Sequence, residues 1–222
     1  MRLNLKIVIP LLVTVLSVSG CATRQLKNFK EAAAANNWQE IAATEVDCKA
    51  NDASCNQLHL LKGDACYRLA KQNTDGVKNY QCAAEQLEQG IHLTADWAAA
   101  EALVGKRAQY FENWCESLRL LRSEQTSTAA ATPYNQKLHA CAREFLQAPG
   151  ELKPAATFFL HNAELAAIRF QINDTGSCEA LKQLQQNESQ AAAQAAQSRY
   201  ADHHRRLLND IAGIKASIPG CP

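Results

Sequence analysis

The chain has 222 residues, of which 47% are apolar and 20% charged, a composition too hydrophobic for wholesale disorder. It contains 39 alanines against nine glycines and six prolines. Because alanine loses no side-chain entropy on entering a helix, this balance favours an all-α fold and argues against a β-sandwich or barrel. The net charge of +1 at pH 7 gives no reason to expect nucleic-acid binding.

The N-terminal 20 residues have the features of an export signal. Arg2 and Lys6 precede an apolar run over residues 7–18, and small residues follow it. The run is interrupted by Pro10 and is too short for a stable membrane span. We therefore expect residues 1–20 to be a signal peptide that is removed.

The segment Val18-Ser19-Gly20-Cys21 resembles the lipobox of bacterial lipoproteins. The resemblance implies that a diacylglycerol is attached to Cys21, that the chain is cleaved before it and that the new amino terminus is acylated. Ala22 stands where lipoproteins retained in the inner membrane usually have Asp, which implies the outer membrane of a Gram-negative bacterium, facing the periplasm. Residues 21–25 would then be a lipidated tether and residues 26–222 a single helical domain. The alternative is an ordinary secretory signal with an incidental cysteine.

Beyond the signal, apolar residues recur at three- and four-residue spacing between short polar breaks, which predicts seven to nine helices and no strand. The first four helices are expected over residues 26–35, 38–46, 58–69 and 80–91. Thr94 is the expected N-cap of a long fifth helix that continues to Leu121, followed by a loop over residues 123–132.

Prolines mark the start of the next two predicted helices. Pro133 and Pro154 are expected in the first turns of the sixth and seventh helices, where a missing amide hydrogen costs nothing. The stretch 178–217 is expected to be one long helix, or two that break near residues 187–189.

Eight cysteines follow Cys21, and an even number in an oxidising compartment indicates four disulfides. Eight cysteines allow about a hundred pairings, but chain order favours pairing each with the next. The expected bonds are Cys48–Cys55, Cys66–Cys82, Cys115–Cys141 and Cys178–Cys221, stapling the helices together. The alternative is metal binding, which has no CxxC, CxxCH or His/Cys cluster behind it, so we expect no metal and no cofactor.

The fourth predicted helix resembles the second helix of a tetratricopeptide repeat. Its pattern Ala83-x3-Leu87-x2-Gly90 places small residues where two helices approach and a large residue in the gap. Gly63 and Gly105 would hold the small position of the first helices, if one loop near residues 71–78 is longer than in the family. The resemblance covers residues 24–115 and implies antiparallel helical hairpins stacked as a solenoid. The alternative is a generic antiparallel helical array.

A solenoid of this kind has a concave face on which another protein can lie. The resemblance implies that polar residues of the first helices line this face. The candidate partner-binding residues are Asn56, His59, Lys62, Arg68, Lys106, Gln109 and Asn113. The alternative is that each is an ordinary solvated residue on its helix.

The sequence contains no convincing catalytic constellation. In the polar cluster 202–206, the adjacent His203 and His204 would point about 100° apart on a helix and so cannot chelate one metal. Glu116-Ser117 resembles the Glu-Ser pair of helical lytic transglycosylases, but the apolar segment 118–121 replaces the glycine-rich segment of that family. We therefore expect no enzyme, no catalytic residue and no small-molecule substrate.

These observations together predict an outer-membrane-anchored periplasmic lipoprotein. We expect it to act as a protein–protein interaction scaffold or assembly factor for an envelope machine, such as a pilus, a secretion system or outer-membrane protein assembly. Its partners would be a protein of the cell envelope and, through Cys21, the membrane itself. The alternative is a periplasmic thiol- or metal-binding helical protein, for instance a copper binder, which requires reduced cysteines.

Overall fold

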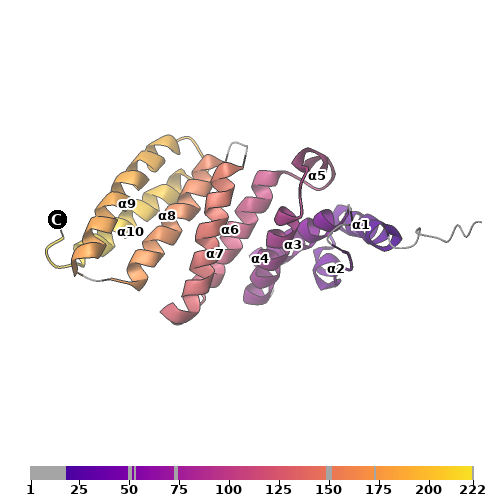
Figure 1. Ribbon diagram of the computed structural model, residues 1–222, viewed down its shortest axis with the longest axis horizontal. Helices are drawn as coiled ribbons and strands as arrows, with labels where there is room; N and C mark the ends of the chain where they lie inside the picture. Colours follow the sequence, from indigo (N-terminus) through magenta and orange to yellow (C-terminus); the bar gives the residue numbers. More distant parts are fainter. Residues whose placement is uncertain are drawn as a thin grey trace, which may run out of the picture.

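The computed structural model describes residues 19–49, 52, 54–72, 75–148, 152–172 and 174–221. Every regular element in these residues is an α-helix, which confirms the all-α prediction. Ten helices lie in this part of the chain, more than the seven to nine expected. Figure 1 shows α1 and α2 at one end of the molecule and α9 and α10 at the other. Their bounds are α1 (Ser19–Ala34), α2 (Trp38–Ala43), α3 (Cys55–Lys71), α4 (Gly76–His92), α5 (Trp97–Leu103), α6 (Arg107–Ser123), α7 (Thr128–Gln147), α8 (Lys153–Phe170), α9 (Asp174–Gln194) and α10 (Ala201–Ala216).

From α3 onward the long helices form two layers. Along the chain, α3 packs on α4, α4 on α6, α6 on α7, α7 on α8, α8 on α9 and α9 on α10. Helices two places apart in this series also meet, because α3 contacts α6, α6 contacts α8 and α8 contacts α10. Helices α3, α6, α8 and α10 therefore make one layer, and α4, α7 and α9 make the other (Figure 1).

The main apolar core runs between these layers. The rings of Phe111 in α6 and Phe145 in α7 stack with their centroids 5.4 Å apart, and Trp114 and Phe159 are almost completely buried in the same core. Removing one such side chain from water contributes about 1.5–3 kcal/mol, so this core is the main source of stability.

The N-terminal segment differs from the expected tether. Residues 1–18, which hold most of the predicted signal peptide, lie outside the described residues. Residues 21–25 belong to α1, because Ala22 and Leu26 are buried in an apolar cluster with Ile41 and Leu58. The segment expected to be a tether is thus helical in this structure, and Cys21 itself is exposed and unpaired. No helix of the described residues is both long and apolar enough to span a bilayer.

Two glycines allow α3 and α4 to approach closely. A Cβ atom at Gly63 would lie 2.6 Å from Leu87 Cγ, and one at Gly90 would lie 2.8 Å from the backbone nitrogen of Leu60. Both are positions that the repeat pattern marked as small. Gly105, expected in a first helix, instead lies between α5 and α6 with φ +138°, a conformation that favours glycine.

The predicted long fifth helix is two helices, α5 and α6. Asp96, rather than Thr94, caps α5 by accepting a hydrogen bond from the Ala99 amide at 3.2 Å. The carboxylate of Glu101 then accepts a hydrogen bond from the Arg107 amide at 2.8 Å, which satisfies a donor at the start of α6.

Two other helix boundaries differ from the prediction. Helix α7 begins at Thr128, because Ser127 caps it by accepting from the Ala130 amide at 3.3 Å, so Pro133 lies in its second turn rather than its first. Pro154 lies in the first turn of α8, as predicted. Residues 187–189 continue α9, and the C-terminal break falls at residues 195–200.

All eight cysteines after Cys21 lie in the described residues and form disulfides in the predicted pairs. The bonds are Cys48–Cys55, Cys66–Cys82, Cys115–Cys141 and Cys178–Cys221. The second joins α3 to α4 and the third joins α6 to α7. The first joins the segment after α2 to the start of α3, and the fourth joins α9 to the C-terminal end of the chain.

Candidate functional site

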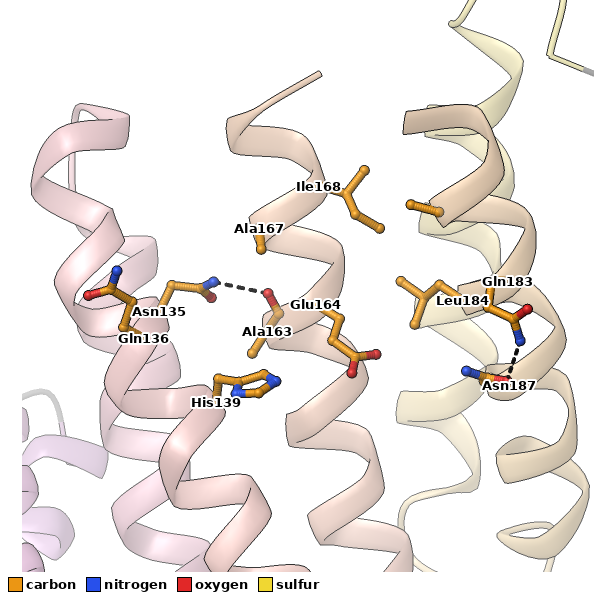
Figure 2. Close-up of a pocket in the computed structure, with 11 residues that line it drawn as sticks. Asn135, Gln136, His139, Ala163, Glu164, Ala167, Ile168, Gln183, Leu184 and Asn187 are labelled. Carbon is orange, nitrogen blue, oxygen red and sulfur yellow. Dashed lines mark hydrogen bonds between the residues drawn. The ribbon is translucent and has the colours of Figure 1, made fainter. Parts of the chain in front are cut away.

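An open hollow of about 670 Å³ lies between helices α7, α8 and α9 (Figure 2). Helix α8 forms its floor, since α7 and α9 pack on either side of α8. The hollow therefore has the form of a groove between two helices of the same layer.

The floor and one wall of this hollow are apolar. Ala163, Ala167 and Ile168 come from α8, and Ala180 and Leu184 come from α9. Three of these five are alanines, whose methyl groups leave the space open. Figure 2 shows Leu184 directed toward α8 across this space. The surface suits an apolar ligand of matching shape.

The edges of the hollow are polar and carry little charge. Four amide side chains line it, namely Asn135, Gln136, Gln183 and Asn187, together with His139 and Glu164. Gln183 donates to Asn187 Oδ1 at 3.0 Å, so part of the α9 edge is already ordered. Glu164 supplies a carboxylate, which favours a ligand with a positive charge beside its apolar surface.

An arginine behind the hollow fixes its α7 edge. Asn135 is buried and donates to the Ala163 carbonyl at 3.0 Å (Figure 2), while it accepts from Arg122 Nη1 at 2.7 Å. Arg122 also donates from Nη2 to Asn162 Oδ1 at 2.7 Å. Burial, with repulsion from Arg119 and Arg169, lowers the pKa of Arg122 to about 10, so it stays charged at neutral pH. These bonds hold α6, α7 and α8 together beneath the site.

The cluster of metal-donor side chains and the Glu-Ser pair compared with lytic transglycosylases both lie outside this hollow. Among the described residues, three metal-donor side chains gather at one place, Cys48, Cys55 and His59, which lies outside the hollow. Glu116, which belongs to the Glu-Ser pair that resembles lytic transglycosylases, accepts two hydrogen bonds from Arg119 at 2.6 and 2.8 Å. Both carboxylate oxygens of Glu116 are therefore engaged with a guanidinium of the same helix.

Three of the seven predicted partner-binding residues come together elsewhere. Arg68, Gln109 and Asn113 line a second hollow of about 350 Å³ between α2, α3 and α6. Within it Asp64 accepts hydrogen bonds from Arg68 at 2.8 Å and from Asn113 at 3.1 Å. The Arg68 guanidinium also lies 4.4 Å from the centre of the Trp38 ring. Its polar groups are thus largely engaged with one another.

The other four predicted residues are apart from that hollow, mostly in contacts within the fold. Asn56 donates to Thr94 Oγ1 at 3.1 Å, and Lys62 donates to the Thr44 carbonyl at 2.8 Å. Lys106 is exposed near Glu101 at 3.9 Å. His59 faces a different hollow, beside Cys48 and Cys55. Its burial, together with the positive charge of Lys62, lowers the pKa of its imidazole and keeps it neutral.

The sequence analysis missed a buried network at the C-terminal end. Glu188 accepts hydrogen bonds from His161 Nδ1 at 2.6 Å and from His204 Nδ1 at 2.7 Å. It joins three helices, since His161 is in α8, Glu188 in α9 and His204 in α10. His204 therefore does not belong to a solvated cluster with His203, although Asp202 and Arg205 pair on the surface at 2.5 Å.

The residues of the α7–α9 hollow were also missed. The alanine content of the chain was used only to predict helices, although Ala163 and Ala167 repeat at four-residue spacing on one face of α8. No known family, no curated protein and no solved structure matches this chain.

Proposed function

We propose that this protein is a lipid-anchored scaffold of the periplasm that binds a partner protein of the cell envelope. It would be attached to the outer membrane through acyl chains on Cys21 and would serve a pilus, a secretion system or outer-membrane protein assembly. The observation that carries this proposal is the apolar hollow of about 670 Å³ between α7, α8 and α9. We assign the chain no enzymatic activity.

The layered helical hairpins support a tetratricopeptide-like solenoid as the scaffold. The close approach of Gly63 to Leu87 and of Gly90 to Leu60 is the contact that the repeat pattern requires. The proposed binding surface lies in the layer of α7 and α9. The resemblance implied the first helix of each repeat, that is α3 and α6, which belong to the other layer. In that respect the scaffold departs from the family it resembles.

The ligand best matched to the hollow is one amphipathic helix of the partner. Such a helix lays an apolar stripe into a groove between two other helices, with its anchors three or four residues apart. The alanines of α8 and α9 would receive these anchors, and the amides of Gln136 and Asn187 would bond the polar flanks. A lysine or arginine of the partner would pair with Glu164.

The proposed lipid anchor on Cys21 rests on a separate observation and has a separate test. Cys21 is exposed and unpaired, so its sulfur is accessible for acylation. Labelling of cells with palmitate should mark the wild-type chain and leave Cys21→Ser unmarked. A Cys21→Ser chain that is labelled as strongly as wild type would disprove the anchor and leave the hollow untouched.

Site-specific cross-linking tests the hollow. Gln136 and Gln183 are exposed and lie on opposite edges of the hollow. A photo-reactive residue placed at either position should capture one and the same envelope protein in intact cells. The matched control is Ala193, which is exposed on α9 and does not line the hollow. Capture of the same protein from Ala193, or of different proteins from the two edges, would disprove the assignment.

A further inference from the structure

Three soft-metal donors meet at the start of α3. The sulfur atoms of Cys48 and Cys55 and a ring nitrogen of His59 all lie within 4.8 Å of one another. Cys48 Sγ is 3.9 Å from His59 Nε2. The two sulfurs form a disulfide in this structure, so they are joined to each other rather than available as thiolates.

The His59 ring is already oriented as a metal ligand requires. Its Nδ1 lies 2.9 Å from Gln86 Oε1, an oxygen that only accepts, so Nδ1 carries the proton. In the neutral ring Nε2 then keeps its lone pair, on the side of the Cys48 sulfur. A ligating histidine that donates its other ring N–H to a fixed acceptor is the usual outer-shell arrangement of protein metal sites.

This disulfide lies beside a hollow and closes the shortest loop of the four. It lines a hollow of about 660 Å³ with Glu85, His92 and Lys137, and Cys48 is only half-buried. Cys82 and Cys221 are half-buried in the same way, whereas Cys115–Cys141 is completely buried. Cys48 and Cys55 are 7 residues apart, against separations of 16, 26 and 43 for the other three bonds. The shortest loop removes the least chain entropy, so its opening costs the least stability.

We propose that a dithiol reductant converts the Cys48–Cys55 disulfide and His59 into a copper(I) site. The reductant supplies two electrons and two protons and is itself oxidised to a disulfide, leaving two thiols on this chain. Copper(I) then displaces both thiol protons and is held by two thiolates and His59 Nε2. Thiolates select copper(I) and zinc. With two cysteines and one histidine, zinc completes a fourth position with water, whereas copper(I) is satisfied by the three donors.

The site does not depend on the proposed partner binding. It lies at the start of α3, facing α4 and Lys137 of α7, and uses none of the residues of the α7–α9 hollow. Loss of copper binding would therefore leave the scaffold proposal intact, and loss of partner capture would leave the copper site intact.

The experiment starts from the mature chain, reduced anaerobically with a limited amount of dithiol and then desalted. Mapping of alkylated cysteines should show Cys48 and Cys55 as the first pair opened. Copper(I) is then titrated against a coloured chelator. One copper(I) should bind per reduced chain and none per oxidised chain, and X-ray absorption should report two sulfurs and one nitrogen. Opening of another disulfide first, or equal binding by the oxidised chain, would overturn the proposal.

Variants separate this site from the other cysteines. The double variant Cys48→Ser/Cys55→Ser keeps the other three disulfides and should bind no copper(I) after the same treatment. Gln86→Leu should weaken binding about 10- to 100-fold, the usual cost of losing an outer-shell partner, and His59→Ala should weaken it more. The matched control is His92→Ala, which lines the same hollow and should bind as wild type. Equal affinity in His59→Ala and His92→Ala would overturn the proposal.

Discussion

His204 and Glu188 form a buried ion pair in which the imidazole carries both of its protons. His204 Nδ1 donates to Glu188 Oε1 at 2.7 Å, and His204 Nε2 lies 2.9 Å from the Pro154 carbonyl oxygen. Since both partners only accept, both ring nitrogens must donate. Burial by itself lowers the pKa of His204, but the hydrogen bonds to Glu188 and Pro154 and the charge of Glu188 raise it above its ordinary value of 6.5.

This pair predicts a loss of stability on the alkaline side. A histidine whose pKa is raised by folding contributes stability that is complete below about pH 6.5 and is lost as the pH rises through the folded pKa. The free energy of unfolding should therefore fall between pH 6 and 9 more steeply in wild type than in His204→Gln. Urea unfolding of wild type and of His204→Gln across this pH range measures the two free energies. Parallel curves would show that His204 is not the titrating group.

Removing one partner of the pair should cost more than removing both. Glu188 and His204 are both completely buried, so a single leucine at either position leaves the other polar group without its partner. We expect Glu188→Leu to destabilise by about 3–5 kcal/mol, and Glu188→Leu/His204→Leu by clearly less than the sum of the two single variants. Additive losses in urea unfolding would mean that the two residues are not coupled.

Glu188 also shows why one part of the fold could not be predicted from local patterns. Residues 187–189 are polar and were expected to break a helix. Yet Glu188 continues the buried stripe of Leu181, Leu184, Ala191 and Ala195 at helical spacing. Its charge is acceptable there because His161 and His204 come from other helices. That compensation is tertiary, and no window of sequence around residue 188 contains it.

The parts that were predicted depend on local chemistry. The helical period locates α3 and α4, and the small residues Gly63 and Gly90 indicate where they cross. The disulfide pairs follow from chain order, because hairpins bring neighbouring cysteines together. The hollow between α7 and α9 could not be found in this way, since it depends on space that Ala167 and Ala180 leave unfilled after packing.

Substitution of Gly63 and Gly90, where α3 and α4 cross, should separate two effects on stability, namely the close approach of the helices and helix propensity. Gly63→Ala and Gly90→Ala each place a methyl group under 3.0 Å from atoms of the neighbouring helix and should destabilise by about 1–3 kcal/mol. Gly213→Ala is the matched control, because it lies in α10 with nothing within 4 Å and should stabilise by about 0.5–1 kcal/mol. Chemical denaturation measures all three. Stabilisation by all three would show that α3 and α4 can move apart freely.

The disulfides should differ in what their removal costs. By loop-closure entropy alone, replacement of Cys178 and Cys221 by serine, with a separation of 43, should cost about 4 kcal/mol. Replacement of Cys48 and Cys55, with a separation of 7, should cost about 2.4 kcal/mol. Thermal and urea unfolding of the two double variants show which of them loses more stability. The reverse order would indicate that enthalpic differences at the bonds outweigh the constraint on the unfolded chain.

Filling the α7–α9 hollow should abolish partner capture without unfolding the protein. Ala167 and Ala180 are exposed helical residues, and arginine has nearly the helix propensity of alanine, so Ala167→Arg and Ala180→Arg should fold normally. Each places a long cationic side chain where the partner's apolar stripe would lie, which should lower cross-linking from Gln136 at least about tenfold. Ala140→Arg, exposed on α7 outside the hollow, is the matched control and should leave capture unchanged. If instead Gln109→Arg in the α2–α3–α6 hollow removes capture and the two alanine variants do not, the partner binds the surface that the repeat resemblance implied, and the assignment to α7–α9 is wrong.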